Sequence, residues 1–78
     1  MLPLQCRLGR VAAHWSAQQL AEAAGVAVNT VTKFERGGDA RVSTVLLLQR
    51  ALEAAGVVFV SEGESSMSGG PGVRLKGQ

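Results

Sequence analysis

The side chains best suited to chemistry in this chain of 78 residues lie close together, shortly before its middle. The amide of Asn29 can donate to and accept from the edge of one adenine, and Lys33 can reach a guanine or a phosphate. Val28 and Thr32 can contact the methyl group of thymine. This combination favours contacts with the base edges of double-stranded DNA over the making or breaking of bonds.

These residues belong to an expected helix from about Ala27 to Arg36, which ends at Gly37 and Gly38. A helical wheel puts apolar side chains on one face and polar ones on the other. The apolar face holds Ala27, Val31 and Phe34, and the opposite face holds Asn29, Thr32, Lys33 and Arg36. We therefore expect one face to pack inward and the other to meet a partner.

A second expected helix comes just before, from Ser16 to Ala24. Ser16 has the side chain of an N-cap, and Gln19 stands where a capping box has Glu or Gln. Gly25 suits the end of the helix. Two helices joined by a tight glycine turn are typical of a helix-turn-helix, whose second helix enters the major groove.

The rest of the chain gives weaker signals. Apolar residues at helical spacing predict a first helix over residues 4–14, in which Gly9 permits close approach of a neighbour. Ser43 is the expected cap of a fourth helix that ends near Ala55. The apolar arc of this helix is wider than one buried face needs. Short strands are expected at 57–60 and 73–76, joined by a loop over 61–72. Such a hairpin needs a helix beneath it or strands from a second chain.

With this pattern of helices and turns, the chain resembles the lambda-repressor-like family of helix-turn-helix regulators. The resemblance covers about residues 4–56, and the GGPGVRLK segment of the tail is similar to the end of short bacterial regulators. The fold class it implies is mostly α, with four to five helices and a C-terminal β-hairpin or strand. The residues that carry it are Ser16, Leu20-Ala21, Gly25-Val26, Thr30-Val31 and Glu35-Arg36-Gly37.

The resemblance also implies roles. Base reading falls to Val28, Asn29, Thr32 and Lys33. Phosphate binding falls to Ser16, Gln18, Arg36, Arg41, Ser43 and Thr44. Arg10 and Glu35 correspond to a structural ion pair. Two departures affect these expectations, because Ala17 and Ala27 stand where many members carry a polar side chain.

One such unit buries too little surface for tight specific binding, whereas two recognition helices one DNA turn apart read both halves of a near-palindrome, so we expect a homodimer on such an operator. The expected organisation is a DNA-binding domain over residues 1–56 and a dimerising β extension over residues 57–78. Candidate interface residues are Leu47, Val58, Val60, Val73 and Leu75, which leaves open whether helix four or the tail forms the contact. RNA polymerase is a further candidate partner.

Composition excludes several alternatives. The net charge of +2 and pI of about 9.3 permit nucleic-acid binding without requiring it. A single cysteine, Cys6, gives no internal disulfide, and we expect no metal, no cofactor, no small-molecule ligand and no catalytic set. The single cysteine fits a reducing cytoplasm, and we see no signal peptide and no membrane span. We therefore expect a cytoplasmic, nucleoid-associated protein, and the family resemblance implies one of bacterial or phage type. Two rival functions remain, an antitoxin that represses its own operon and a protein-interaction module that retains the fold.

Overall fold

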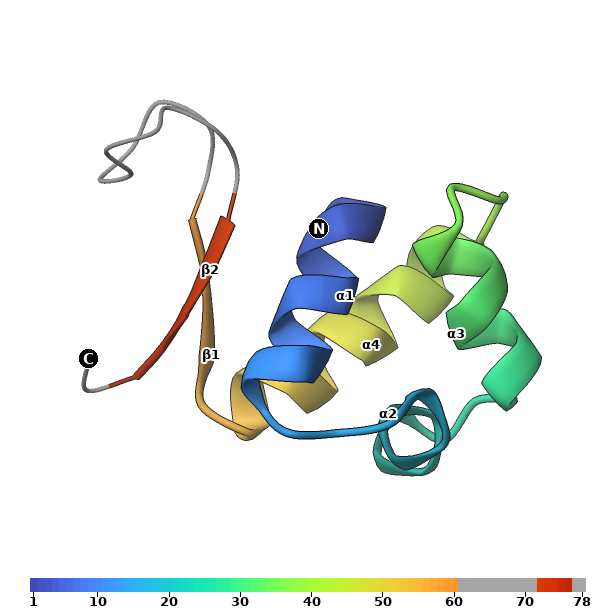
Figure 1. Ribbon diagram of the computed structural model, residues 1–78. Coiled ribbons are helices and arrows are strands. Elements are labelled where there is room, and N and C mark those ends of the chain that lie inside the picture. Colours follow the sequence, from blue (N-terminus) through green and yellow to red (C-terminus); the bar gives the residue numbers. More distant parts are fainter. Residues whose placement is uncertain (61–71, 77–78) are drawn as a thin grey trace.

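Within the part of the chain that the structure describes, four helices are followed by one antiparallel hairpin (Figure 1). The computed structural model describes residues 1–60 and 72–76, so nearly all of the expected loop over 61–72 lies outside the described residues. The mostly helical fold with a C-terminal hairpin is confirmed. The elements are α1 (Pro3–Ala12), α2 (Ala17–Ala24), α3 (Val28–Glu35), α4 (Val42–Ala54), β1 (Val57–Val60) and β2 (Gly72–Leu75).

Both ends of α2 form as the sequence predicts. The Ser16 hydroxyl oxygen accepts from the Gln19 backbone N–H at 3.1 Å, and the Ser16 N–H donates to the Gln19 Oε1 at 2.8 Å. These reciprocal bonds satisfy two donors that the helix itself leaves unpaired. Gly25 ends the helix with φ at 74°, a left-handed conformation that glycine adopts at little cost.

Helix α1 forms, but the apolar stripe that predicts it faces solvent. Leu4, Leu8 and Val11 are exposed, while the residues turned inward are Gln5, Cys6 and Gly9. A methyl group at Gly9 would stand 3.1 Å from the Val57 side chain. The glycine therefore allows the close approach that the sequence suggests, and the helix packs through its small residues rather than its leucines.

The predicted cap of α4 is wrong. The helix begins at Val42, with Arg41 as its N-cap in extended conformation, and Ser43 is already inside the first turn. No side chain caps this helix end. Because a capping hydroxyl must belong to the last non-helical residue, which is Arg41, Ser43 lies two residues too late to cap the helix.

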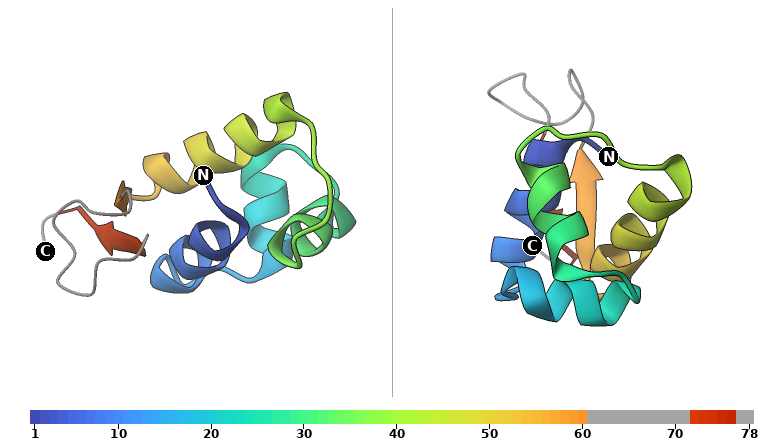
Figure 2. Two further views of the ribbon diagram at one scale, coloured as in Figure 1. Left: turned by 90° about the horizontal axis from the view of Figure 1, so that it is seen from above. Right: turned by 90° about the vertical axis from the view of Figure 1, so that its right-hand side faces the viewer.

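One apolar core joins the helices to the hairpin. Its buried members are Cys6, Leu20, Ala21, Val31, Phe34, Leu48, Leu52 and Val57. In the hairpin, Val57 pairs with Leu75 and Phe59 pairs with Val73, and these four side chains pack toward the core. Helices α1 and α4 supply the surface that an isolated hairpin lacks. The hairpin and α3 lie at opposite ends of the molecule (Figure 2).

The Gln5 side chain fastens the hairpin to α1. Its Nε2 donates to the backbone oxygens of Val60 at 3.0 Å and of Gly72 at 3.2 Å, and its Oε1 accepts from the Leu2 N–H at 2.9 Å. The residue is only 6% exposed, so water does not readily replace these partners. A buried glutamine with all three contacts made is therefore a specific link between helix and sheet.

Replacing Gln5 by alanine should lower the free energy of unfolding by about 2 kcal/mol, because buried carbonyl oxygens lose their donors. Urea denaturation followed by circular dichroism measures this value. Gln49→Ala is the matched control, since the Gln49 amide makes only a weak exposed bond of 3.4 Å to Glu53. Equal effects of the two substitutions would contradict the role given to Gln5.

Candidate nucleic-acid interface

Helix α3 packs on α1 and α2 through Val31 and Phe34 and turns its other face to solvent. Its bounds agree with the predicted span to within one residue. Ala27 is the N-cap and makes no side-chain cap bond, as its lack of a polar group requires. The backbone N–H groups at the start of α3 are therefore uncapped by that side chain.

The polar side chains of α3 form its outer face. Asn29, Lys33 and Arg36 are exposed and Thr32 is half-buried. Together with Gly37 and Gly38 they line one shallow hollow. The Thr32 hydroxyl donates to the Asn29 carbonyl oxygen at 3.1 Å, which leaves the methyl group and the oxygen lone pairs for other contacts.

Unlike the other three predicted base-reading residues, Val28 contacts the core. It is half-buried and packs against the core at the first position of α3. Thr30, which was not among the predicted site residues, lines a hollow together with Lys33. The helical wheel gives no clear signal for it, because Thr30 falls between the exposed Lys33 and the buried Phe34.

The turn after α3 runs close to the last helical turn. The Gly38 N–H donates to the Lys33 carbonyl oxygen at 2.9 Å, and a methyl group at Gly38 would approach Lys33 Cγ to 2.7 Å. Only glycine fits this position without displacing the backbone of α3. Gly38 therefore leaves the space that the Lys33 side chain occupies.

Basic side chains lie along two sides of α3, and we call these two regions its basic flanks. One of them lies on the side that faces α4. A hollow there is lined by Thr30, Lys33, Asp39, Ala40, Arg41 and Thr44. Arg41 is exposed as the N-cap of α4, and Ser43, the second residue of the helix, is also exposed. The structure thus brings Arg41 and Thr44, two predicted phosphate-binding residues, next to Lys33.

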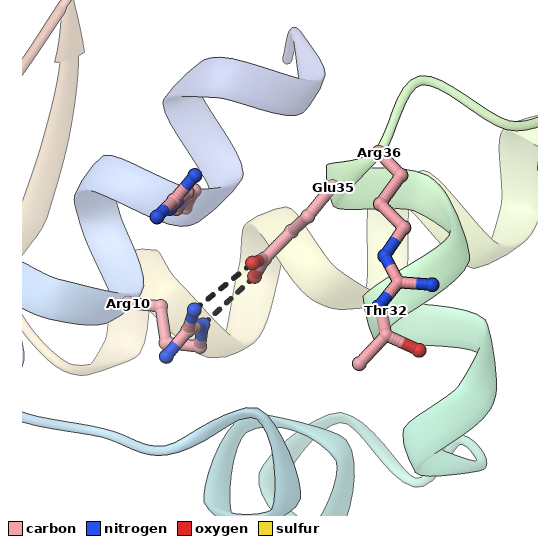
Figure 3. Close-up of a pocket in the computed structure, with 5 residues that line it drawn as sticks. Arg10, Thr32, Glu35 and Arg36 are labelled. Atoms are coloured by element: carbon pink, nitrogen blue, oxygen red, sulfur yellow. Dashed lines mark hydrogen bonds and ion pairs between the residues drawn. The ribbon is translucent and has the colours of Figure 1, made fainter.

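The side of α3 that faces α1 holds the ion pair of Arg10 and Glu35 (Figure 3). The Arg10 Nε donates to Glu35 Oε2 at 2.8 Å and Nη2 donates to Oε1 at 3.0 Å. The third nitrogen, Nη1, donates to the Trp15 carbonyl oxygen at 3.1 Å. One guanidinium group therefore joins α1, the turn before α2, and α3.

The two partners of this ion pair are largely buried, with side chains 18% and 9% exposed. The hydrogen bonds to Glu35 raise the pKa of Arg10 above its ordinary value. Beneath the pair, the Cys6 Sγ lies 3.8 Å from Glu35 Oε2. Burial, with a smaller contribution from Glu35, raises the pKa of Cys6 to about 12, so this thiol stays protonated and acts as a packing residue.

The start of α2 keeps two more predicted phosphate-binding residues at the surface. Ser16 and Gln18 are exposed, and the Gln18 amide donates to Glu22 Oε1 at 3.2 Å. The first backbone N–H groups of a helix point outward and attract anions. Ala17 offers such an N–H group in place of the polar side chain that it lacks.

The predicted dimer residues do not share one face. Val73 and Leu75 pack inward against the core of their own chain, whereas Val58 alternates with the inward-facing Val57 and Phe59 and so lies on the opposite face of β1, together with Val60. Leu47 is 44% exposed on α4. Strand alternation turns the half-buried Val73 and Leu75 toward the core of their own chain, and the expectation that all five residues contact a partner stays a prediction.

Charge is concentrated around α3. The residues that line its two flanks include the basic side chains of Arg7, Arg10, Lys33, Arg36 and Arg41. They also include the acidic side chains of Glu35 and Asp39, which leaves a net charge of +3 in a chain whose total is +2. Arg7 was not among the predicted site residues, although it stands one turn before Arg10 on the same helix.

Other kinds of site find no support in the described parts of the chain. No group of three His, Cys, Asp or Glu side chains within residues 1–60 and 72–76 is placed to hold a metal ion. Over the same residues, none of the helices has the length and apolar character needed to cross a membrane.

Comparison with known proteins agrees with the fold. A helix-turn-helix family profile of the lambda-repressor-like type matches residues 7–55, which is more than half of the chain. The chain belongs to this family, whose members are DNA-binding proteins. No curated protein sequence matches the chain.

Loss of one partner of the ion pair should destabilise the fold strongly. We expect Glu35→Ala to lower the free energy of unfolding by about 3 kcal/mol, because it leaves the Arg10 charge partly buried without its carboxylate. Chemical denaturation of Arg10→Met, of Glu35→Leu and of the double variant that combines them measures the coupling. The double variant should recover part of the loss, and additive losses would show that the two side chains are not coupled.

Proposed function

We propose that this protein is a sequence-specific transcriptional regulator that binds double-stranded DNA in the major groove as a homodimer. The observation that carries the proposal is the outer face of α3, which presents Asn29, Thr32 and Lys33 between two basic flanks. None of the ion pairs or side-chain hydrogen bonds among described residues engages the Asn29 amide or the Lys33 ammonium. Both groups are therefore available to bases.

The dimensions of α3 suit this role. A helix of eight residues is about 12 Å long, comparable to the width of the major groove. In the groove, base edges face the crest of the helix and a sugar-phosphate backbone runs along each side. Asn29 is suited to adenine, and Lys33 to guanine or to a nearby phosphate. Ser16, Gln18, Arg36, Arg41, Ser43 and Thr44 are the proposed phosphate contacts.

The dimer follows from the small size of this surface. One such helix contacts few base pairs, whereas two helices about 34 Å apart read both halves of a near-palindromic operator. Leu47 on α4 and Val58 with Val60 on the outer hairpin face are the accessible apolar side chains from the predicted set. A regulator of this kind acts in the cytoplasm on promoter DNA, where RNA polymerase is the further partner.

Asn29→Ala should weaken binding to the preferred duplex by about 1–3 kcal/mol and relax the preference at one base pair per half-site. The preferred duplex is first obtained by selection from a random pool with the wild-type chain. Binding of that duplex and of single-base variants is then measured by fluorescence anisotropy at fixed salt.

A second substitution, Lys33→Ala, is compared with its matched control Lys76→Ala in the same binding measurement. Both lysines are exposed, but Lys76 adjoins the hairpin at the other end of the molecule. A loss of affinity confined to Lys33→Ala supports reading by α3. Equal losses for the two variants, or unchanged specificity of Asn29→Ala, would exclude α3 as the reader.

Two chains should bind each selected duplex, as sedimentation velocity of the complex can show. We expect either Leu47→Glu or Val58→Glu to convert binding to a one-to-one complex of lower affinity, because a buried charge disrupts an apolar contact. The variant that does so locates the interface. A wild-type complex with a single chain per duplex would contradict the homodimer. Deleting the hairpin is not suitable, because Val57 is a core residue.

A further inference from the structure

The hollow between α1 and α3 contains more positive charge than the fold needs. It is lined by Arg7, Arg10, Thr32, Glu35 and Arg36 (Figure 3). Arg10 and Glu35 neutralise each other within their bidentate pair. The other two guanidinium groups, of Arg7 and Arg36, are exposed, and neither makes an ion pair with the described residues.

The position of this hollow is as informative as its charge. It lies along the α1 side of α3, while the hollow with Arg41 and Thr44 lies along the α4 side. A helix seated in the major groove has one phosphate backbone on each side. The recognition surface thus has a basic flank for each strand. On the α4 side, Arg41 and Thr44 were predicted from the sequence, whereas on the α1 side Arg36 was predicted and Arg7 was not.

We infer that Arg7 and Arg36 form a seat for a phosphodiester group of the DNA strand that runs beside α1. The inference rests on the proposed DNA binding and adds Arg7 as a contact residue. Guanidinium groups recognise phosphate oxygens through paired N–H donors. The Arg10–Glu35 pair fixes the distance between α1 and α3, so it positions the two arginines from opposite walls of the hollow.

The salt dependence of binding tests this seat. Each phosphate contact that is lost should lower the slope of log affinity against log salt by about 0.9 per bound chain. Between 50 and 200 mM salt, wild-type affinity should therefore fall about 3.5-fold more per bound chain than that of Arg7→Ala. The probe is the duplex selected from a random pool by the wild-type chain, together with a scrambled duplex of equal length.

Two matched variants serve as controls. Arg50→Ala removes an exposed arginine from the interior of α4, so it changes net charge equally without touching the hollow. Arg7→Lys retains the charge and should keep the wild-type slope. Arg7→Ala should weaken binding to the selected and scrambled duplexes by the same factor, because a phosphate contact carries no base information.

Methylphosphonate substitution locates the contact on the DNA. Neutralising single phosphates of the selected duplex should weaken wild-type binding at several positions, and Arg7→Ala should be insensitive at one of them in each half-site. The inference is overturned if Arg7→Ala keeps the wild-type slope and the wild-type pattern of sensitive phosphates. If the wild-type chain selects no duplex at all, the proposed function fails instead.

Discussion

The ion pair between Arg10 and Glu35 is the constraint on which the DNA-facing surface depends. Helix α3 has only eight residues, four of them β-branched, and no side-chain cap at its start. A helix of this length and composition is not stable alone in water. Burial of Val31 and Phe34 holds it against the core, and the bidentate bonds from Arg10 fix its last turn to α1. The orientation of every side chain on its outer face follows from these contacts.

The two ends of the molecule differ in the kind of residues that they present. At one end, α3 and its basic flanks leave polar and charged groups exposed. At the other end, the hairpin covers α1 and α4, and Gln5 binds its backbone to α1. Because the hairpin contributes Val57 to the core, it is part of the folding unit and not an appended arm. Stability therefore depends on the core and on the hairpin, whereas recognition depends on the exposed residues on and beside α3.

Much of this fold could be predicted from the sequence, where local rules and tertiary packing agree. Ser16 with Gln19 and the left-handed Gly25 specify α2 by side-chain chemistry alone. Periodicity misjudged α1, because the small Gly9 fits against Val57 and Leu52 and Cys6 is buried in the core, while Leu4 and Leu8 stay exposed. The inward direction of Val73 and the part played by Arg7 depend on register and on the spacing between helices. Neither the strand register nor the spacing between helices can be predicted from a local sequence pattern.

The central claim is that the outer face of α3 meets the major groove, flanked by phosphate contacts on both sides. Backbone amide chemical shifts of the labelled protein, titrated with its selected duplex, test this most directly. The account predicts large changes over residues 28–38, at 16–18 and 41–44 and at Arg7, with little change over 72–76. Changes concentrated on the hairpin, with residues 28–38 unaffected, would contradict it.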